Sequence, residues 1–495
     1  MQGKKQALNP YLPGWEYVPD GEPRVFGDRV YLYGSHDIFG GDNFCLGDYV
    51  CWSAPVNDLG NWKLEGVIYR RNQDPRNQNG RQFMCAPDVI QGRDGRYYLY
   101  YQLSELPITS VAVSDAPVGP YSFYGYVQHP DGKPWGEKKG DVFVFDPGVL
   151  VDDDGKVYLY AGFSPKPGWF KTILKLRGNS VEESMCLQLE PDMKTVCGEE
   201  MPVVPGPVKA KGTEFEGHAF FEASSIRKVN DRYYYVYSSE LSHELCYAVS
   251  RYPDREFHYG GTLISIGDIG YQGRTSPNNY MGNTHGGMAE ICGKWYIFYH
   301  RQTNRQMCAR QGCAEELQVQ EDGSILQAEM TSCGLNRGPL EGSGTYEARI
   351  ACNLKSAVGT FPYEKAHEKD KNGIHPYFTQ ENADNSEKPV SYIANMTDGS
   401  VAGFKYFLLN QPVWIGVKVR GTGEGIMEVR TSETGDCAVC VPVSASADWQ
   451  VFSAEASLMQ NGKKALFFTY RGKGYIDFRE FELKEQRQEN RYDKN

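Results

Sequence analysis

The sequence predicts an all-β protein, a five-bladed β-propeller followed by a β-sandwich of the jelly-roll type. Five short segments rich in the aromatic and β-branched residues of sheets recur about every 60 to 76 residues, each after a tight turn of Gly, Asp or Asn with a basic residue. Repeats of this length built from hairpins are typical of propeller blades. Beyond Gly342 the repeat stops, and short strands separated by polar loops indicate a sandwich. The repeats are recognised by Tyr31, Tyr98, Tyr158, Tyr234 and Tyr296.

These elements divide the chain into three parts. Residues 1–342 are predicted to form the propeller and to carry the catalytic site. Residues 343–485 are predicted to form the sandwich, and residues 486–495 a charged tail.

A polar residue stands ten to twelve positions before the repeating tyrosine in every blade. The innermost strand of a propeller blade lies against a central channel. If this polar position begins the innermost strand, the five side chains converge at one mouth of the channel. They are Asp20, Asp88, Asp146, Glu222 and His285.

Glu222 has the surroundings that a general acid needs. Two phenylalanines precede it and small residues follow it. Apolar neighbours disfavour the charged form of a carboxyl group and keep it protonated near neutral pH. Convergent acids without a nucleophilic Ser or Cys motif indicate glycoside hydrolysis, in which one carboxylic acid protonates the leaving oxygen and a carboxylate activates water.

Composition excludes several other classes. A net charge of -11 leaves no basic stripe for nucleic acid. The first ten residues have no apolar segment of a secretory signal, and no apolar run reaches 18 residues, so neither secretion nor a membrane span is predicted. Thirteen cysteines without a framework spacing favour a reduced, cytoplasmic protein. A chain trimmed of its signal would look the same and would be extracellular.

Several motifs together resemble glycoside hydrolase family 43. They are the run from Asn9-Pro10 through Asp20 to Tyr33, then Ala86-Pro87-Asp88, Asp146-Pro147, Phe221-Glu222-Ala223-Ser224 and Thr284-His285-Gly286. The resemblance implies a five-bladed propeller that acts on arabinose- and xylose-containing glycans with inversion. The second domain more loosely resembles family 6 carbohydrate-binding modules, through Tyr346-Glu347-Ala348, Tyr392-Ile393, Asp448-Trp449-Gln450 and Tyr475-Ile476-Asp477-Phe478.

The resemblance also implies roles for three carboxylates. Asp20 matches the general base and Glu222 the general acid. Asp146 matches a third carboxylate, which positions the acid and raises its pKa by its negative charge. Glu22 is an alternative to Asp20, because it precedes a proline as the family's base often does. Glu214 and Glu216 are the neighbouring alternatives to Glu222.

Further residues are expected around the substrate. Arg310 matches an arginine that binds sugar hydroxyls, and His285 matches a channel histidine that in many members faces a calcium ion or a water. Because Ca²⁺ prefers oxygen ligands, we expect His285 to face an ion only through water. No cofactor is expected for the chemistry itself. Asp88 is a candidate for substrate binding or for a structural role, and the candidate sugar platforms are Phe83, Trp15, Phe39 and Trp169.

The sequence therefore predicts an inverting exo-glycosidase that releases arabinose or xylose from xylan- or arabinoxylan-derived oligosaccharides. Inversion predicts catalytic carboxyl groups roughly 6.5–9.5 Å apart. One alternative is a retaining fructan-type enzyme, with carboxyl groups about 5 Å apart, although Phe145-Asp146-Pro147 replaces its usual Arg-Asp-Pro. The other is a non-catalytic glycan-binding propeller. The choice between xylosidase and arabinofuranosidase and the oligomeric state stay open.

Overall fold

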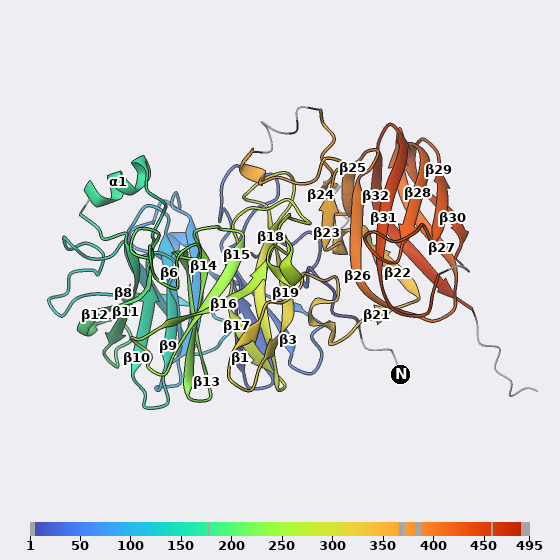
Figure 1. Ribbon diagram of the computed structural model, residues 1–495. Helices are drawn as coiled ribbons and strands as arrows, with labels where there is room; N and C mark the ends of the chain where they lie inside the picture. The colour runs from blue at the N-terminus through green and yellow to red at the C-terminus, as the bar shows by residue number, and fades with distance from the viewer. Residues whose placement is uncertain are drawn as a thin grey trace, which may run out of the picture.

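The regular secondary structure of the protein is almost wholly β-strand. The computed structural model describes residues 5–176, 178–365, 370, 372–381, 389–456 and 459–486. Five four-stranded sheets form a propeller and two six-stranded sheets form a sandwich beside it (Figure 1). The predicted fold class is confirmed. The predicted tail lies outside the described residues, apart from Gln486.

Each blade is one antiparallel sheet whose strands follow one another in sequence. Blade one contains β1 (Glu22–Phe26), β2 (Arg29–Tyr33), β3 (Tyr49–Pro55) and β4 (Lys63–Tyr69). Blade two contains β5 (Met84–Gln91), β6 (Tyr97–Leu103), β7 (Thr109–Ser114) and β8 (Ser122–Tyr126). Blade three contains β9 (Gly148–Val151), β10 (Val157–Ala161), β11 (Glu183–Leu189) and β12 (Val196–Pro205). Blade four contains β13 (Phe220–Val229), β14 (Arg232–Ser239), β15 (Glu244–Ser250) and β16 (His258–Ser265). Blade five contains β17 (Met288–Ile291), β18 (Lys294–Gln302), β19 (Arg310–Val319) and β20 (Ile325–Leu326).

The first strands of the blades form the wall of the channel. Strands β1, β5, β9, β13 and β17 each contact the next, and β17 contacts β1, which closes the ring. The tyrosine-rich segments are the second strands, one step outward. The amino-terminal segment is fastened to blade five, where the Asn9 side chain donates to Ala314 O (2.9 Å) and Glu315 Oε1 (2.8 Å). This segment therefore helps to hold the ring closed, because in the described part of the chain no blade contains a strand from another blade.

The remaining elements are short helices and the sandwich. The α-helix α1 (Trp169–Leu176) belongs to blade three, and the 3₁₀ helices are η1 (Arg71–Gln73), η2 (Tyr271–Gly273), η3 (Gly334–Asn336), η4 (Ala348–Ile350) and η5 (Tyr363–Lys365). No helix in the described ranges is long and apolar enough to cross a membrane.

The sandwich packs its two sheets over an aromatic core that includes Phe404, Phe468 and Phe481. One sheet contains β21 (Leu340–Glu341), β23 (Asn353–Lys355), β26 (Val401–Leu409), β28 (Glu424–Arg430), β29 (Val439–Val443) and β31 (Gly462–Lys473). The other contains β22 (Gly344–Glu347), β24 (Tyr377–Gln380), β25 (Ser391–Met396), β27 (Pro412–Gly421), β30 (Ser446–Glu455) and β32 (Ile476–Glu485). Strand β21 already joins the sandwich just before residue 343.

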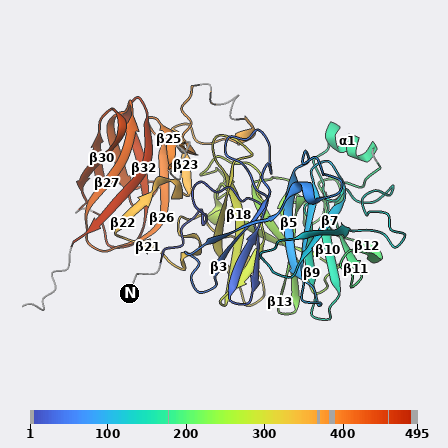
Figure 2. The same cartoon turned by 180° about the vertical axis from the view of Figure 1, so that it is seen from behind.

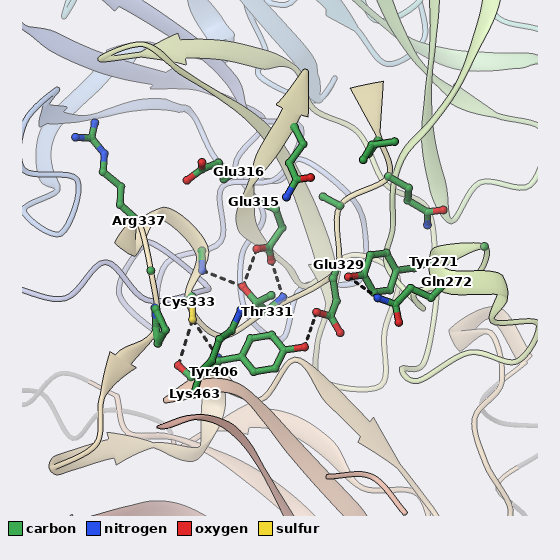
Figure 3. A pocket seen from close by; sticks show the side chains of 18 residues that line it. Tyr271, Gln272, Glu315, Glu316, Glu329, Thr331, Cys333, Arg337, Tyr406 and Lys463 are labelled. Atoms are coloured by element: carbon green, nitrogen blue, oxygen red, sulfur yellow. Dashed lines mark hydrogen bonds between the residues drawn. The ribbon is translucent and has the colours of Figure 1, made fainter. Parts of the chain in front are cut away.

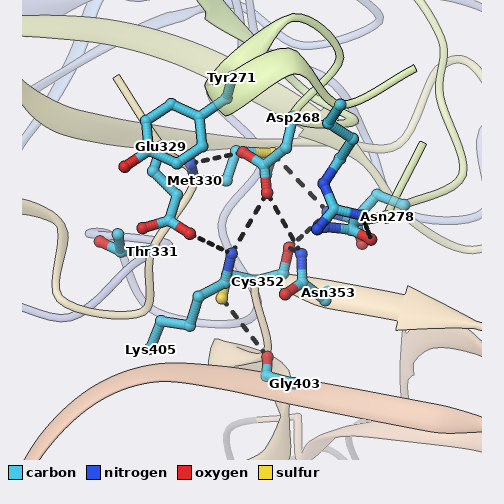
Figure 4. Close-up of polar contacts among 12 residues, drawn as sticks. Asp268, Tyr271, Asn278, Glu329, Met330, Thr331, Cys352, Asn353, Gly403 and Lys405 are labelled. Atoms are coloured by element: carbon cyan, nitrogen blue, oxygen red, sulfur yellow. Dashed lines mark hydrogen bonds and ion pairs between the residues drawn. The ribbon is translucent and has the colours of Figure 1, made fainter. Parts of the chain in front are cut away.

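The two domains are joined by buried polar contacts. Both views show β23 and β26 on the side of the sandwich that faces the propeller, and Figure 1 shows β24 there as well (Figures 1 and 2). Lys405 Nζ lies 2.9 Å from Glu329 Oε1 and 3.3 Å from Asp268 Oδ2 (Figure 4). An open cavity of about 580 Å³ lies beside this ion pair, with Tyr271, Glu329 and Tyr406 in its wall (Figure 3). Separating the domains would leave the buried Lys405 and Asp268 without their charged partners, which is costly.

Candidate active site

Strand pairing fixes how deep each predicted acid lies in the channel. In each blade the repeating tyrosine pairs with one residue of the first strand, and depth can be counted back along the chain from this paired residue. Asp20, Asp146 and His285 each lie four positions before the paired residue of their own blade. Glu222 lies five positions before it, because β13 is bulged. Asp88 lies only two positions before it. Because the hairpin turns differ in length, spacing in the sequence alone does not show this difference in depth. Four of the five side chains therefore meet at the mouth, and Asp88 lies deeper.

The depth of Asp88 corrects the expectation that it binds substrate. Its Oδ1 accepts a hydrogen bond from Arg24 Nε at 2.9 Å, and its Oδ2 accepts one from the Val149 amide at 2.9 Å. Glu22 lies at the same level, and its Oε2 accepts a hydrogen bond from Arg227 Nη2 at 2.7 Å. Both carboxylates thus belong to ion pairs that fill the channel, and Glu22 does not replace Asp20 at the mouth.

The mouth opens into a pocket of about 390 Å³. Three carboxylates, a histidine, an arginine and a phenylalanine among the predicted residues line it: Asp20, Asp146, Glu222, His285, Arg310 and Phe83. The other candidate platforms, Trp15, Phe39 and Trp169, are not part of its lining. The alternative acids Glu214 and Glu216 do not line the pocket either. Both are exposed, Glu214 in an ion pair with His258 and Glu216 accepting a hydrogen bond from the Gly212 amide.

A β-bulge directs Glu222 into the pocket. The pairing of β13 with β14 is irregular on both sides of Glu222, and Ala223 has a φ of 72°. Bulges turn a side chain away from the regular face of a strand. Glu222 is half-buried, and burial together with the negative charges of Asp146 and Asp20 raises its pKa to about 8. The carboxyl group is therefore protonated at neutral pH, as the apolar neighbours predicted.

Asp20 has the opposite protonation. Burial acts to raise its pKa, but Arg310, whose Nη1 lies 2.8 Å from Asp20 Oδ1, together with His300, His285 and Ser35 outweighs burial, and the net pKa lies below the ordinary value. The Asp20 amide also donates to His300 Nδ1 at 3.3 Å. Burial and the nearby Arg310 lower the pKa of His300 to about 3, so this ring is neutral and able to accept. Asp20 is thus an ionised carboxylate held by a cation.

His285 lies between two carboxylates. Its Nδ1 is 3.5 Å from Asp146 Oδ2 and 4.0 Å from Asp20 Oδ1. Burial acts to lower the pKa of His285, but Asp146 and Asp20 raise it to about 9, so the ring is a cation at neutral pH. Burial raises the pKa of Asp146 in spite of this partner. The imidazolium thereby offsets part of the negative charge that gathers at the mouth.

The residues near His285 do not by themselves form a calcium site. Ca²⁺ takes about six to eight oxygen ligands. Glu22 Oε1 is buried without a hydrogen-bond partner in the described part of the chain, but Glu22 Oε2 and the Asp88 oxygens are used by arginines. On the channel side of His285, away from Asp146 and Asp20 at the mouth, one carboxylate oxygen and a histidine fall well short of that shell. An ion here would be held mostly by water.

Several residues of this site were not found from the sequence, among them Asp37, His300 and Glu364. Asp37 accepts two hydrogen bonds from Arg310, one from Nε to Oδ2 at 2.8 Å and one from Nη2 to Oδ1 at 3.0 Å. His300 lies under Asp20 as described above. Glu364 comes from the second domain and lines the pocket. The polar segment after β2 is a weak sequence signal for Asp37. Glu364 belongs to no repeat, so no sequence signal points to it.

Comparison with known proteins identifies the family. The family model described as glycosyl hydrolases family 43 matches residues 9–325. The chain belongs to this family. A "xylosidase/arabinosidase" of Thermoclostridium stercorarium is 49% identical over 97% of this chain and 99% of its own length. A "xylosidase/arabinosidase" of Bacteroides ovatus is 31% identical over 64% of this chain and 97% of its own length. The prediction of a glycoside hydrolase is confirmed.

Solved structures of this family share the fold. An arabinoxylan arabinofuranohydrolase from Bacillus subtilis, in complex with cellotetraose, matches with a TM-score of 0.51 and 20% identity over 97% of this chain and 99% of its own. A β-xylosidase/α-arabinofuranosidase from a compost microbial metagenome, in complex with xylotriose, matches with a TM-score of 0.51 and 25% identity over 66% of this chain and 98% of its own. The first of these covers the propeller and the sandwich together.

Proposed function

We propose that this protein is an inverting exo-glycosidase that releases a terminal arabinose or xylose from xylan- or arabinoxylan-derived oligosaccharides. The two relatives named xylosidase/arabinosidase support the sugar class. One observation carries the reaction: two carboxyl groups of one pocket have pKa values pushed apart, with Glu222 raised to about 8 and Asp20 lowered. Such a pair supplies a proton donor and a proton acceptor at the same pH.

The reaction follows from this pair. Asp20 takes a proton from a water molecule, whose oxygen attacks the anomeric carbon from the face opposite the leaving group. The bond from that carbon to the leaving oxygen breaks, and the leaving oxygen takes the proton of Glu222. Asp146 keeps Glu222 protonated until then. Arg310 holds Asp20 and presents donors to sugar hydroxyls. Solvent afterwards restores both carboxyl groups.

The filled channel supports action at chain ends. Below the mouth the channel is occupied by the buried ion pairs of Glu22 with Arg227 and of Arg24 with Asp88. A glycan therefore has no path through the propeller. The pocket therefore has a floor, and we propose that it holds the terminal residue of a chain.

The test is hydrolysis by wild type, Glu222→Gln and Glu216→Gln. We expect wild type to cleave nitrophenyl α-L-arabinofuranoside, nitrophenyl β-D-xyloside or both, and Glu222→Gln to be slower by about 10²–10⁴-fold. The loss should be larger on xylobiose, because its poorer leaving group depends more on protonation. Glu216→Gln is the control from the preceding loop. Wild-type rates in Glu222→Gln would place the acid elsewhere.

Product stereochemistry separates the alternatives. Inversion predicts that the first-formed sugar has the anomeric configuration opposite to that of the substrate, which NMR detects before mutarotation. Retention would instead support the fructan-type mechanism. Failure of wild type to hydrolyse any aryl glycoside, xylo-oligosaccharide or arabinoxylan fragment would support the glycan-binding alternative.

The second domain and the location of the protein belong to the same proposal. We propose, on the motifs given above, that the sandwich is a module of the family 6 carbohydrate-binding type. The test is to measure binding of xylan by the full chain that carries Arg420→Ala or Trp449→Ala. Arg420 lies 4.3 Å from the Trp449 ring centre, beside Tyr392. The thirteen cysteines, all free thiols, support a cytoplasmic location, which cell fractionation tests.

A further inference from the structure

A mixed set of metal-ligand side chains lies at the pocket end of blade four, outside the catalytic pocket. His218 lies two residues before the start of β13, and Glu244 and Cys246 lie at the start of β15. Their ligand atoms all lie within 4.8 Å of one another. Glu244 Oε1 is 2.7 Å from His218 Nδ1 and 3.3 Å from Cys246 Sγ, and Sγ is 3.9 Å from Nδ1. None of the three lines the catalytic pocket.

We infer that His218, Glu244 and Cys246 form a binding site for a transition-metal ion of the Zn²⁺ type. Imidazole, carboxylate and thiolate are the ligands that Zn²⁺ takes, and three protein ligands leave one position for water. A tetrahedral Zn²⁺ with these ligands needs separations of about 3.3–3.6 Å between ligand atoms. The His218–Glu244 separation of 2.7 Å has to widen by about 0.6–0.9 Å, and the Sγ–Nδ1 separation of 3.9 Å has to shorten by about 0.3–0.6 Å.

Neighbouring side chains already hold the set in place. Ser239 Oγ donates to Glu244 Oε1 at 2.7 Å, and Thr262 Oγ1 donates to Oε2 at 3.2 Å. The His218 ring is stacked on Tyr259, with ring centres 5.1 Å apart. Contacts of this kind orient metal ligands and are part of most metal sites. His218 is about one-third exposed (36%), while Glu244 and Cys246 are buried, so an ion would enter from the His218 side.

Metal binding has a defined proton balance. Without a metal, the Nδ1–H of His218 donates to Glu244, and this hydrogen bond raises the pKa of His218. On binding, Cys246 loses its thiol proton as the sulfur–metal bond forms. An imidazolium at position 218 loses its Nδ1 proton as the nitrogen–metal bond forms. Binding should therefore release more protons, and weaken, as the pH falls.

The test uses Co²⁺ as a spectroscopic substitute for Zn²⁺. Cys437 and Cys440, whose sulfurs are 3.1 Å apart, are a competing thiol pair at the surface of the sandwich, so the experiment starts from the Cys437→Ser/Cys440→Ser protein. After treatment with a chelator, we expect one equivalent of Co²⁺ to give the strong visible bands of four-coordinate cobalt and a thiolate charge-transfer band. Zn²⁺ should then abolish both signals.

Single changes identify the ligands. Cys246→Ser should remove the charge-transfer band, and His218→Gln, at a partly exposed position, should weaken Co²⁺ binding at least tenfold. Cys186→Ser removes a buried thiol of blade three and should change nothing. Hydrolysis of a nitrophenyl glycoside checks that each variant is folded. A thiolate band that survives in Cys246→Ser, equal affinity in His218→Gln, or no stoichiometric binding by the parent protein would overturn the proposal.

Discussion

Glu222 combines a catalytic advantage with a cost in stability. Its folded-state pKa of about 8 lies above the ordinary value for glutamate. Between the two values the native state binds more protons than the unfolded state, so this group makes the free energy of unfolding fall as the pH rises. An acid kept protonated for catalysis therefore lowers the free energy of unfolding at alkaline pH.

Replacing Glu222 by glutamine should stabilise the inactive protein. The neutral amide has no charge to desolvate, so we expect Tm of Glu222→Gln to exceed that of wild type at pH 8 by a few degrees, or about 1–2 kcal/mol. The gain should be much smaller at pH 5, because this pH is close to the ordinary pKa of glutamate and the unfolded state there also binds part of the proton. Thermal unfolding at the two pH values measures it. A difference that does not depend on pH would contradict the raised pKa, and Glu216→Gln should show no difference at either pH.

Asp146 is expected to act through the pKa of Glu222. Activity should fall on the alkaline side as Glu222 loses its proton, near pH 8. Asp146→Asn removes a negative charge that raises this pKa, so the alkaline limb of kcat/KM should move to lower pH and kcat should also fall. Asp153→Asn, at an exposed turn of the same blade, is the control and should leave the profile unchanged. An unmoved alkaline limb in Asp146→Asn would show that Asp146 has another role.

At the scale of the strand, repeat spacing predicted most of the site. It found the blades, and four of the five residues that it predicted for the mouth do lie there. This is because the propeller repeats one hairpin and therefore one geometry. It placed Asp88 wrongly, because depth in the channel depends on which residues pair across each hairpin, and turns of different length conceal the pairing. Asp37 and His300 escaped detection because they touch Arg310 and Asp20 only after distant segments meet.

The corrected place of Asp88 leads to a prediction about blade two. Asp88→Ala leaves the buried Arg24 without its carboxylate, which should reduce the free energy of unfolding by about 3–5 kcal/mol. Because Asp88 does not line the pocket, KM of the protein that remains folded should stay near wild type. Denaturant unfolding and steady-state kinetics below the melting range measure the two effects. Asp115→Asn, exposed in the same blade, is the control, and a stable Asp88→Ala with a raised KM would restore the substrate-binding role.

The whole molecule shows that the pocket is built by both domains. The Tyr363 amide donates to Met281 O at 2.8 Å, and Pro362 forms a β-bridge with Met281, so this segment of the second domain is attached to the loop before blade five. Tyr363 is buried beside Tyr280. This anchor holds the exposed Glu364 at the rim of the pocket. The sandwich therefore contributes a carboxylate that no propeller repeat could supply.

Glu364 should affect the sugar residues beyond the one that is released. A carboxylate accepts hydrogen bonds from sugar hydroxyls, whereas an ammonium group only donates, so Glu364→Lys should raise KM for xylo-oligosaccharides or arabinoxylan fragments about tenfold, or about 1.4 kcal/mol. The KM for a nitrophenyl glycoside, which has no second sugar, should change little. Glu424→Gln, exposed on the sandwich and absent from the pocket lining, is the control. Equal effects of Glu364→Lys on both substrates would mean that Glu364 contacts the released sugar, and no effect on either would mean that the second domain acts on the pocket only by holding its shape.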